Sequence, residues 1–381
     1  MTSPRLVALI FWGSLFLTLY TFVGYPTLMV GLGRFFPRRT GAKPQRQFPT
    51  VTVVLAVYNE AGRILTKLQN LLNSDYPKEQ LDVVVVSDGS TDATVERICS
   101  LNEPRVRLLA QPQRCGKAHC LNVALAAAGG EIIVFADTRQ HFAPQTVAKL
   151  ASHFSQPEIG GVSGALEIEP AGSHVGEGID AYWHVEKLLR CSESRWDSCI
   201  GCSGAVYAIR RDLFKKLPSD TLLDDVVIPM QIAVAGYHIA FEPEAGAYDP
   251  QTLEPDRETI RKRRTLAGNY QMLFRHLSWL LPWRNRLWWN LISHKYLRLA
   301  APFLLLAMFV ANAMLLGQPR FRLLFFSQAF FYLLGACGLA CSSRRLFLLS
   351  IPAGFVFLNW MALTALWQYL CRRATPAWEK V

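Results

Sequence analysis

The chain has 381 residues, a hydrophobic content of 51% and a formal net charge of +11 at pH 7. This length allows one large domain with accessory elements, or two domains. The distribution of charge argues against nucleic acid as a partner, because residues 60–258 contain 18 Lys and Arg against 28 Asp and Glu. An acidic central part lacks the basic patch that nucleic-acid binding requires.

The first element along the chain is a long apolar segment from Leu6 to Met29. It is long enough to cross a bilayer core of roughly 30 Å, and longer than the apolar core of a signal peptide. The segment that follows, GRFFPRRTGAKPQRQFP, is basic, and no acidic residue precedes Glu60. Basic flanks are typical of the cytoplasmic side of a membrane. We therefore expect residues 1–47 to form a retained anchor and a basic linker.

Residues 48–275 show an α/β pattern. β-branched apolar runs, typical of buried strands, alternate with segments that repeat apolar residues at helical spacing. The expected strands are 51–59, 81–90, 106–111 and 131–137, and the expected helices between them are 60–74, 92–101 and 116–128. This alternation predicts a parallel, doubly wound sheet of the Rossmann-like class, which binds ligands beyond the carboxyl ends of its strands.

After residue 275 the chain becomes apolar again. Residues 276–298 are rich in Trp and Arg and contain Pro282, a composition that favours a segment lying at the membrane interface. Three further spans are expected near 299–316, 323–341 and 346–370. Four spans would leave the C-terminus outside, where Arg372 and Arg373 break the positive-inside rule. This part of the topology stays open, and we expect a multi-pass protein of the cytoplasmic (inner) membrane whose central domain faces the cytoplasm.

Polar residues follow each of the four expected strands. Tyr58 and Glu60 follow the first strand, Asp88 ends the second, and Lys117 opens the helix after the third. Asp137-Thr138-Arg139 follows the fourth. Each feature alone is typical of an ordinary turn or helix cap. Together, and in this order, they resemble the nucleotide-binding half of family 2 glycosyltransferases, and the resemblance covers residues 50–270.

That resemblance implies a GT-A fold and a nucleotide-sugar site, and chemistry explains the residue types. A nucleoside needs hydrogen-bond acceptors, which Glu60 and Asp88 offer beside Tyr58. A diphosphate needs a cation, here Lys117 at a helix N-terminus. The leaving diphosphate also needs an oxygen-liganded Mg²⁺ or Mn²⁺, for which the resemblance implies Asp137. The segment GCSGAVYAIRRDLF resembles the loop beside the donor sugar, through Ser203 and Gly204.

The motif LLDDVVIPMQ resembles the acidic pair of the family, Asp224 and Asp225. On that match Asp225 is the general base, which removes the proton from the acceptor hydroxyl as it attacks and so inverts the anomeric centre. The alternative is that both residues only cap a helix. The upstream motifs favour the catalytic interpretation.

The segment IRKRRTLAGNYQ aligns with the Gln-x-x-Arg-Trp motif of membrane-bound processive members. Arg261, Arg264 and Thr265 stand at its Gln, Arg and Trp positions. The resemblance implies that Arg264 binds the leaving diphosphate. Thr265 replaces the Trp of the acceptor platform, which argues against processive extrusion. A basic cluster facing lipid is the alternative for these arginines.

Arg139 stands where the family's Asp-x-Asp motif usually has its second carboxylate. Two outcomes are open. Asp137 alone holds the metal with diphosphate oxygens and water, as Mg²⁺ allows, while Arg139 points elsewhere. Alternatively, Arg139 pairs with the diphosphate and supplies part of the charge of the metal. We favour a metal-assisted site with Arg139 as a helper on the diphosphate.

The sequence thus predicts an inverting membrane glycosyltransferase. Its donor would be a nucleotide sugar, with UDP as the expected nucleotide, and its acceptor a lipid-linked or growing glycan of the envelope or an exopolysaccharide; membrane lipids would be its other partners. Two alternatives are a processive synthase that exports its product and an inactive glycosyltransferase-like scaffold. The acidic pair, Lys117 and Arg264 argue against the scaffold, which would have no need of them.

Overall fold

The computed structural model describes residues 3–38, 48–168, 174–249, 255–340 and 347–371. Their centre is an eight-stranded sheet in the order β3-β2-β1-β4-β7-β6-β8-β5. The strands are β1 (Val51–Val57), β2 (Leu81–Asp88), β3 (Val106–Gln111), β4 (Ile132–Ala136), β5 (His141–Phe142), β6 (Ile159–Ile168), β7 (Val206–Arg210) and β8 (His238–Asp249). The four strands expected from the sequence are all present and lie side by side.

The sheet is parallel only in part. β3, β2, β1 and β4 pair in parallel, as expected. β7 runs antiparallel to both β4 and β6, and β8 then pairs in parallel with β6. The expectation of a parallel sheet is therefore correct for the first half and wrong for the second. The parallel pairing ends at β4 because its other neighbour in the sheet, β7, runs in the opposite direction.

Two hydrophobic layers cover the faces of the sheet. Alternate residues of a strand point to opposite faces, and β1 follows this rule. Val53 and Leu55 pack in the layer that contains Leu68 of α3, whereas Val54 packs in the layer that contains Leu121 of α5. Both faces are buried, which explains why these strands have uninterrupted apolar sequences.

Helices alternate with the strands and continue beyond the sheet. Those of the central domain are α3 (Ile64–Leu72), α4 (Thr94–Ser100), α5 (Lys117–Ala127), α6 (Thr146–Ser152), α7 (His174–Trp196), α8 (Asp224–Val234) and α9 (Pro255–Arg275). The short turns are η2 (Lys78–Gln80), η3 (His153–Ser155), η4 (Arg211–Leu213) and η5 (Leu277–Leu280). The apolar ends contain α1 (Pro4–Leu19), η1 (Tyr20–Gly24), α2 (Tyr25–Phe35), α10 (Trp288–Leu291), η6 (Ile292–Tyr296), α11 (Leu297–Met314), α12 (Pro319–Ala340) and α13 (Phe347–Leu370).

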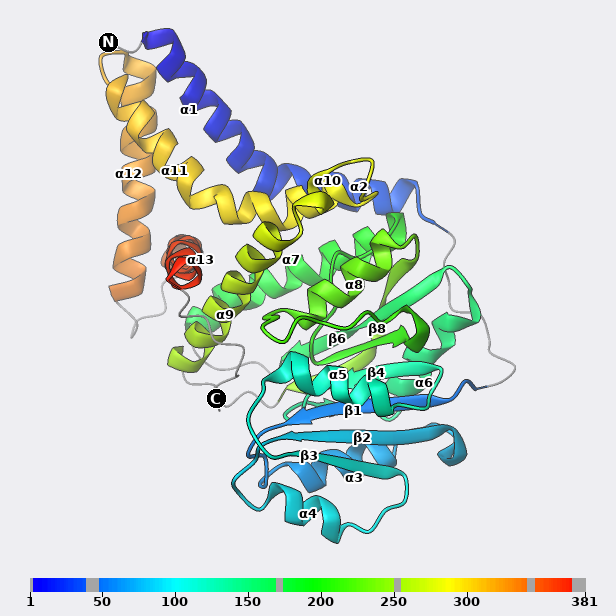
Figure 1. Ribbon diagram of the computed structural model, residues 1–381. Coiled ribbons are helices and arrows are strands. Elements are labelled where there is room, and N and C mark those ends of the chain that lie inside the picture. Colours follow the sequence, from blue (N-terminus) through cyan, green and yellow to red (C-terminus); the bar gives the residue numbers. More distant parts are fainter. Residues whose placement is uncertain (1–2, 39–47, 169–173, 250–254, 341–346, 372–381) are drawn as a thin grey trace.

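Four helical segments of the described chain are long and apolar enough to cross a membrane: Pro4–Phe35, Trp288–Met314, Pro319–Ala340 and Leu349–Leu370. They lie together at one end of the molecule, away from β1–β3 (Figure 1). Large apolar side chains on their surfaces, such as Phe16, Leu323 and Trp367, are exposed, as lipid-facing residues would be. The four expected spans are thus present as helices.

The second span begins earlier than the sequence analysis expected. α10, η6 and α11 form one continuous helical segment from Trp288, so residues 288–298 of the predicted interfacial region belong to a candidate span. Pro282 lies before this segment and does not interrupt it. Arg372 and Arg373, which made the C-terminal topology doubtful, lie outside the described residues.

α7 and α9 lie between the sheet and the apolar helices (Figure 1). α7 packs against α2, and α13 packs against both α7 and α9. The approach of α2 to α7 is close, since a Cβ added at Gly33 would lie 2.7 Å from the carbonyl oxygen of Ser192. The central domain is therefore joined to the apolar helices by direct packing of helices, and α7 forms the centre of that contact.

Candidate active site

A cavity of about 380 Å³ lies between the sheet edge, α8, α9 and the apolar helices. It contains seven of the eleven residues to which the sequence analysis gave a role in the site: Lys117, Asp137, Ser203, Gly204, Asp224, Asp225 and Arg264. These residues come from five separate parts of the chain. The structure therefore brings the expected diphosphate, metal, sugar and base positions into one site.

Lys117 is the link between two of these parts. It is the first residue of α5, after Gly116 at a positive φ of 90°. Its Nζ lies 3.2 Å from Oδ1 of Asp137 and 3.5 Å from Oδ2 of Asp224. Burial opposes the charge of Lys117, but the carboxylates of Asp137, Asp224 and Asp225 outweigh burial and raise its pKa. Lys117 is therefore a fixed cation on the floor of the cavity.

Asp225 is the second residue of α8, and its backbone is held by the loop before β7. Its carbonyl oxygen accepts a hydrogen bond of 2.8 Å from the backbone N–H of Cys202. A Cβ added at Gly204 would lie 2.9 Å from Oδ2 of Asp225. A side chain at position 204 would therefore force the carboxylate of Asp225 to move.

The electrostatic setting of Asp225 suits a base. Burial and then the neighbouring charge of Asp224 raise the pKa of Asp225 to about 6, although Lys117, Arg190 and Lys295 oppose this shift. A carboxylate with a pKa near neutrality accepts a proton more readily than an ordinary one and is still ionised at pH 7. The geometry and the charges together fit proton removal from a hydroxyl group in the cavity.

α9 contributes a row of cations to the same wall. Arg261, Lys262, Arg264 and Thr265 all line the cavity. Burial lowers the pKa of Arg264, and the carboxylates of Asp224, Asp225 and Asp137 oppose that shift. This position in the cavity wall agrees with the alignment of the segment with a motif that binds diphosphate. It does not agree with the alternative, a basic cluster that only faces lipid.

Asp137 fits a divalent metal as a single protein ligand. Its side chain is 41% exposed and lines the cavity. No group of three or more His, Cys, Asp and Glu side chains that could hold a metal occurs among the described residues. Mg²⁺ and Mn²⁺ fit a site with one carboxylate when substrate phosphates and water complete the coordination. The residues present therefore fit a metal that binds together with a diphosphate.

Arg139 does not line this cavity. Its guanidinium forms an ion pair with Asp249 at the end of β8, and Gln140 Nε2 donates to the same Oδ2 of Asp249 at 2.9 Å. Asp249 is 2% exposed, and a buried carboxylate requires such partners. The placement matches the alternative in which Arg139 points elsewhere, and it does not support the expected role of Arg139 on the diphosphate.

Tyr58, Glu60 and Asp88 lie at the same edge of the sheet but outside the cavity lining. The guanidinium of Arg114 stacks over the ring of Tyr58 at 3.9 Å, and Glu60 lies 3.7 Å from Arg63. Asp88 is fully buried and accepts backbone hydrogen bonds from Cys115 at 2.6 Å and from Gly116. Asp88 thus holds the turn that presents Lys117.

Three charged residues of the cavity were not expected there: Glu186 and Arg190 of α7 and Lys295 of η6. Glu186 and Arg190 are four residues apart, so they lie on one face of the helix. The sequence also predicts a helix in this segment, with aromatic residues that could stack on an acceptor sugar or pack in the core, but nothing in it connects α7 with Lys295. The side chains of Tyr182, Trp183 and His184, which could stack on a sugar, lie outside the described residues.

Comparison with known proteins agrees with this geometry. Residues 52–218 match the family described as glycosyl transferase family 2. The chain is 29% identical over 230 residues to an N-acetylglucosaminyltransferase of Rhizobium meliloti, a match that covers 55% of this chain and 54% of that protein. It is 31% identical over 193 residues to a β-monoglucosyldiacylglycerol synthase of Nostoc sp., covering 49% and 39%. The matches thus span about half or less of these relatives' lengths.

One solved structure is similar over nearly the whole chain. It is a mannosyltransferase from Pyrobaculum calidifontis in complex with GDP-mannose and Mn²⁺. The two chains are 25% identical with a TM-score of 0.72, and the match covers 94% of this chain and 99% of the other. The central domain and the arrangement of the apolar helices around it are therefore shared with a protein that binds a nucleotide sugar.

Proposed function

Because residues 52–218 match the family described as glycosyl transferase family 2, we propose that the chain is an inverting membrane glycosyltransferase. It moves a sugar from a nucleotide-sugar donor, with UDP as the expected nucleotide, to a lipid-linked or growing glycan. The observation that carries this proposal is the position of Lys117, within 3.5 Å of both Asp137 and Asp224. Cation, metal ligand and acidic pair thus form one site around the space for a diphosphate.

In the proposed reaction Lys117 and Arg264 bind the diphosphate of the donor, and Ser203 and Gly204 lie beside the sugar. Asp137 would hold Mg²⁺ or Mn²⁺, which when bound neutralises part of the diphosphate charge. Asp225 takes the proton of the acceptor hydroxyl, and the oxygen forms a bond to the anomeric carbon. The bond from that carbon to the diphosphate oxygen breaks on the opposite side, which inverts the centre.

The acceptor is proposed to approach from the side of the apolar helices. Lys295 of η6 and Leu358 of α13 belong to two candidate spans, and both line the cavity. Soluble donors can enter from the sheet edge, whereas an acceptor held in the bilayer can reach the cavity along these helices. This arrangement favours a lipid-linked acceptor over a free sugar.

We place the catalytic domain on the cytoplasmic side of the inner membrane. Arg34 lies in the last turn of α2, and Arg38 pairs with Asp197 of the central domain at 3.1 Å. Basic residues next to a span favour the cytoplasmic face. A reporter fused after residue 381, combined with protease treatment of intact spheroplasts, tests the position of the domain.

Product length distinguishes single addition from processive synthesis. One relative, 26% identical over 224 residues, is a poly-β-1,6-N-acetyl-D-glucosamine synthase of Staphylococcus aureus. In this chain Thr265 lines the cavity where that class of motif carries Trp, and its hydroxyl donates to the carbonyl of Arg261. We expect addition of one sugar, seen as a single new band after separation of radiolabelled product, whereas a ladder of bands would favour a processive synthase.

A panel of donors tests the proposed function. Purified full-length protein is heated with UDP-, GDP- and dTDP-sugars, each with and without Mn²⁺, and the stabilising donor is then incubated with bacterial lipid extract. We expect one donor class to raise the melting temperature only with metal and to label a lipid-extractable product. Stabilisation by none of the nucleotide sugars, with no labelled product, would contradict a glycosyltransferase and favour an inactive scaffold.

A further inference from the structure

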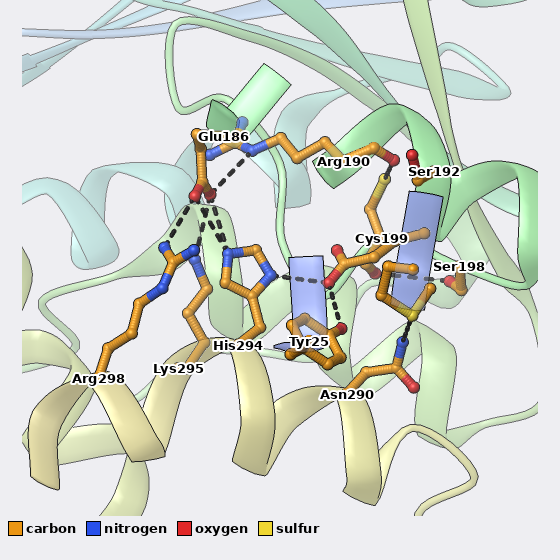
Figure 2. A network of polar contacts seen from close by, with 12 residues as sticks. Tyr25, Glu186, Arg190, Ser192, Ser198, Cys199, Asn290, His294, Lys295 and Arg298 are labelled. Atoms are coloured by element: carbon orange, nitrogen blue, oxygen red, sulfur yellow. Dashed lines mark hydrogen bonds and ion pairs between the residues drawn. The ribbon is translucent and has the colours of Figure 1, made fainter. Parts of the chain in front are cut away.

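A buried polar cluster joins α7 to α2 and to the span that begins at Trp288 (Figure 2). We call it the α7–η6 cluster, and it consists of Tyr25, Glu186, Arg190, Glu193, His294, Lys295 and Arg298. Glu193 and His294 are at most 1% exposed, and Glu186 is 4% exposed. Charges placed so deeply need partners of opposite charge, and the cluster supplies them across three elements.

The cluster has two halves that meet at His294. In one half Glu193 Oε1 accepts from Tyr25 Oη at 2.7 Å and lies 2.7 Å from Nδ1 of His294. In the other half Glu186 lies 3.1 Å from Nε2 of His294 and 3.0 Å from Nη1 of Arg298. Figure 2 shows Glu186 surrounded by nitrogen atoms on three sides.

Only the half that contains Glu186 reaches the cavity. Glu186 lies 3.5 Å from Nε of Arg190 and 3.7 Å from Nζ of Lys295, and all three residues line the cavity with Asp225. Burial opposes the charge of Glu186, but His294, Lys295 and Arg298 hold its pKa well below the ordinary value. Glu186 is therefore a permanent anion among these cations.

Several charged and titratable groups face Asp225 from the surrounding elements. They are Asp224 of α8, Lys117 of α5, Arg264 of α9, Arg190 of α7, Lys295 of η6, Cys202 of the preceding loop and Tyr207 of β7. Two of these cations, Arg190 and Lys295, are also bound by Glu186. Both cations also act on Asp225, which lines the same cavity. A cation drawn onto Asp225 would occupy the oxygen that must receive the proton.

We propose that Glu186 is a positioning residue of the transfer reaction, which holds Arg190 and Lys295 away from Asp225 and thereby keeps the base free. The inference rests on the proposed role of Asp225. It also gives the membrane helix a part in catalysis, because Lys295 comes from a candidate span and Arg190 from the central domain. A shift of that helix relative to α7 would change the charges around the base.

The test compares pH profiles of kcat for two variants with opposite expected effects. Glu186→Gln removes an anion, so the cations act more strongly on Asp225 and the acidic limb of the profile moves to lower pH, with a lower plateau. Lys295→Met removes a cation, so the acidic limb moves to higher pH. Each shift should be about half a pH unit or more, as expected for a buried charge close to the titrating group. Glu186→Asp should restore most of the plateau.

Glu193→Gln is the matched control. Glu193 is as buried as Glu186 and shares His294, but none of its hydrogen bonds or ion pairs joins it to Arg190 or Lys295. We expect this variant to lower the melting temperature and to leave the acidic limb in place. A merely structural cluster would lower stability in all variants without opposite shifts of the pH profile.

The outcomes separate the two proposals. If the wild-type protein transfers no sugar, the proposed function fails and the profiles are not needed. If it does, the positioning role is overturned when the acidic limbs of Glu186→Gln and Lys295→Met stay in place or move in the same direction. It is also overturned when the limb of Glu193→Gln shifts as far as that of Glu186→Gln. Should Glu186→Gln not fold, the profiles of Glu186→Asp and Lys295→Met decide, and an unshifted Lys295→Met overturns the inference.

Discussion

Arg139 and Asp249 form an ion pair that joins the loop after β4 to the last residue of β8. The carboxylate of Asp249 is 2% exposed, and the side chain of Arg139 is 18% exposed. Arg139 stands two residues after Asp137, where a second metal-binding carboxylate would complete the motif. The pair therefore explains the departure from that motif, because the side chain at this position binds a buried carboxylate at the border of the site and leaves Asp137 as the proposed metal ligand.

Removal of Arg139 alone should destabilise the protein. Among the described residues, Arg139→Met leaves the buried carboxylate of Asp249 with Gln140 as its remaining side-chain donor, a change that costs about 3–5 kcal/mol. The double variant Arg139→Met with Asp249→Asn should recover most of the loss, because no charge remains buried. Arg275→Met is the control, since Asp220 in that pair is 56% exposed and such pairs contribute about 0–1 kcal/mol. Melting temperatures in detergent measure all three; an unchanged value for Arg139→Met would contradict the structural role.

Asp225→Asn should raise stability near neutral pH while it removes the base. Burial raises the pKa of Asp225 from 3.8 to about 6, so the charged form is disfavoured in the folded state. The protonated form of Asp225 therefore contributes to the stability of the wild type at low pH, and this contribution is lost as pH rises through about 6. Asn at this position carries no charge, so the variant avoids the loss. We expect the melting temperature of the variant to exceed that of the wild type at pH 7–8, with a difference that shrinks towards pH 4. A constant difference over this range would contradict the shifted pKa.

Gly204→Ala should impair the reaction more than the binding of donor. The added Cβ would lie 2.9 Å from Oδ2 of Asp225, so the carboxylate must move. Misplacement of a base lowers kcat, and we expect a loss of about tenfold or more with little change in KM for the donor. Gly129→Ala is the control, because nothing lies within 4 Å of a Cβ at that position. Equal kinetics for the two variants would show that position 204 tolerates a side chain.

Asp137→Asn should weaken the response to metal. The side chain of Asp137 is 41% exposed, so its carboxylate is accessible to a metal ion. Mg²⁺ and Mn²⁺ prefer ionised oxygen ligands. We expect the Mn²⁺ concentration for half-maximal activity to rise about tenfold or more, and excess chelator to abolish wild-type activity. Asp75→Asn, at an exposed position outside the cavity lining, is the control. Full wild-type activity in chelator would exclude metal assistance.

The sequence predicted most of the first half of the sheet because β1, β2 and β4 are buried on both faces. Val51–Val57 and Leu81–Asp88 consist mainly of apolar residues, and that signal does not depend on distant contacts. It also placed Lys117, Asp137 and Asp225 correctly in one cavity. The antiparallel entry of β7 was not predictable in this way, since the direction of a strand in a sheet is set by its connections and leaves no mark on its own residues.

The membrane side of the site was missed for a related reason. Lys295 and Glu186 are more than a hundred positions apart, and the tertiary structure brings η6 and α7 together through the pairs of Glu186 with His294 and Lys295. Likewise, the partner of Arg139 lies 110 positions away in β8. Local sequence patterns identify residues that can bind or catalyse, but the residue that pairs with a buried charge depends on the tertiary structure.

The most direct test is single-turnover transfer by Asp225→Asn protein with saturating donor and acceptor, beside a donor-binding measurement on the same preparation. If a carboxylate at position 225 removes the acceptor proton within a site that still holds the nucleotide, binding should persist while the transfer rate falls at least about a hundredfold. Transfer at the wild-type rate would place the base elsewhere and contradict the account of this cavity.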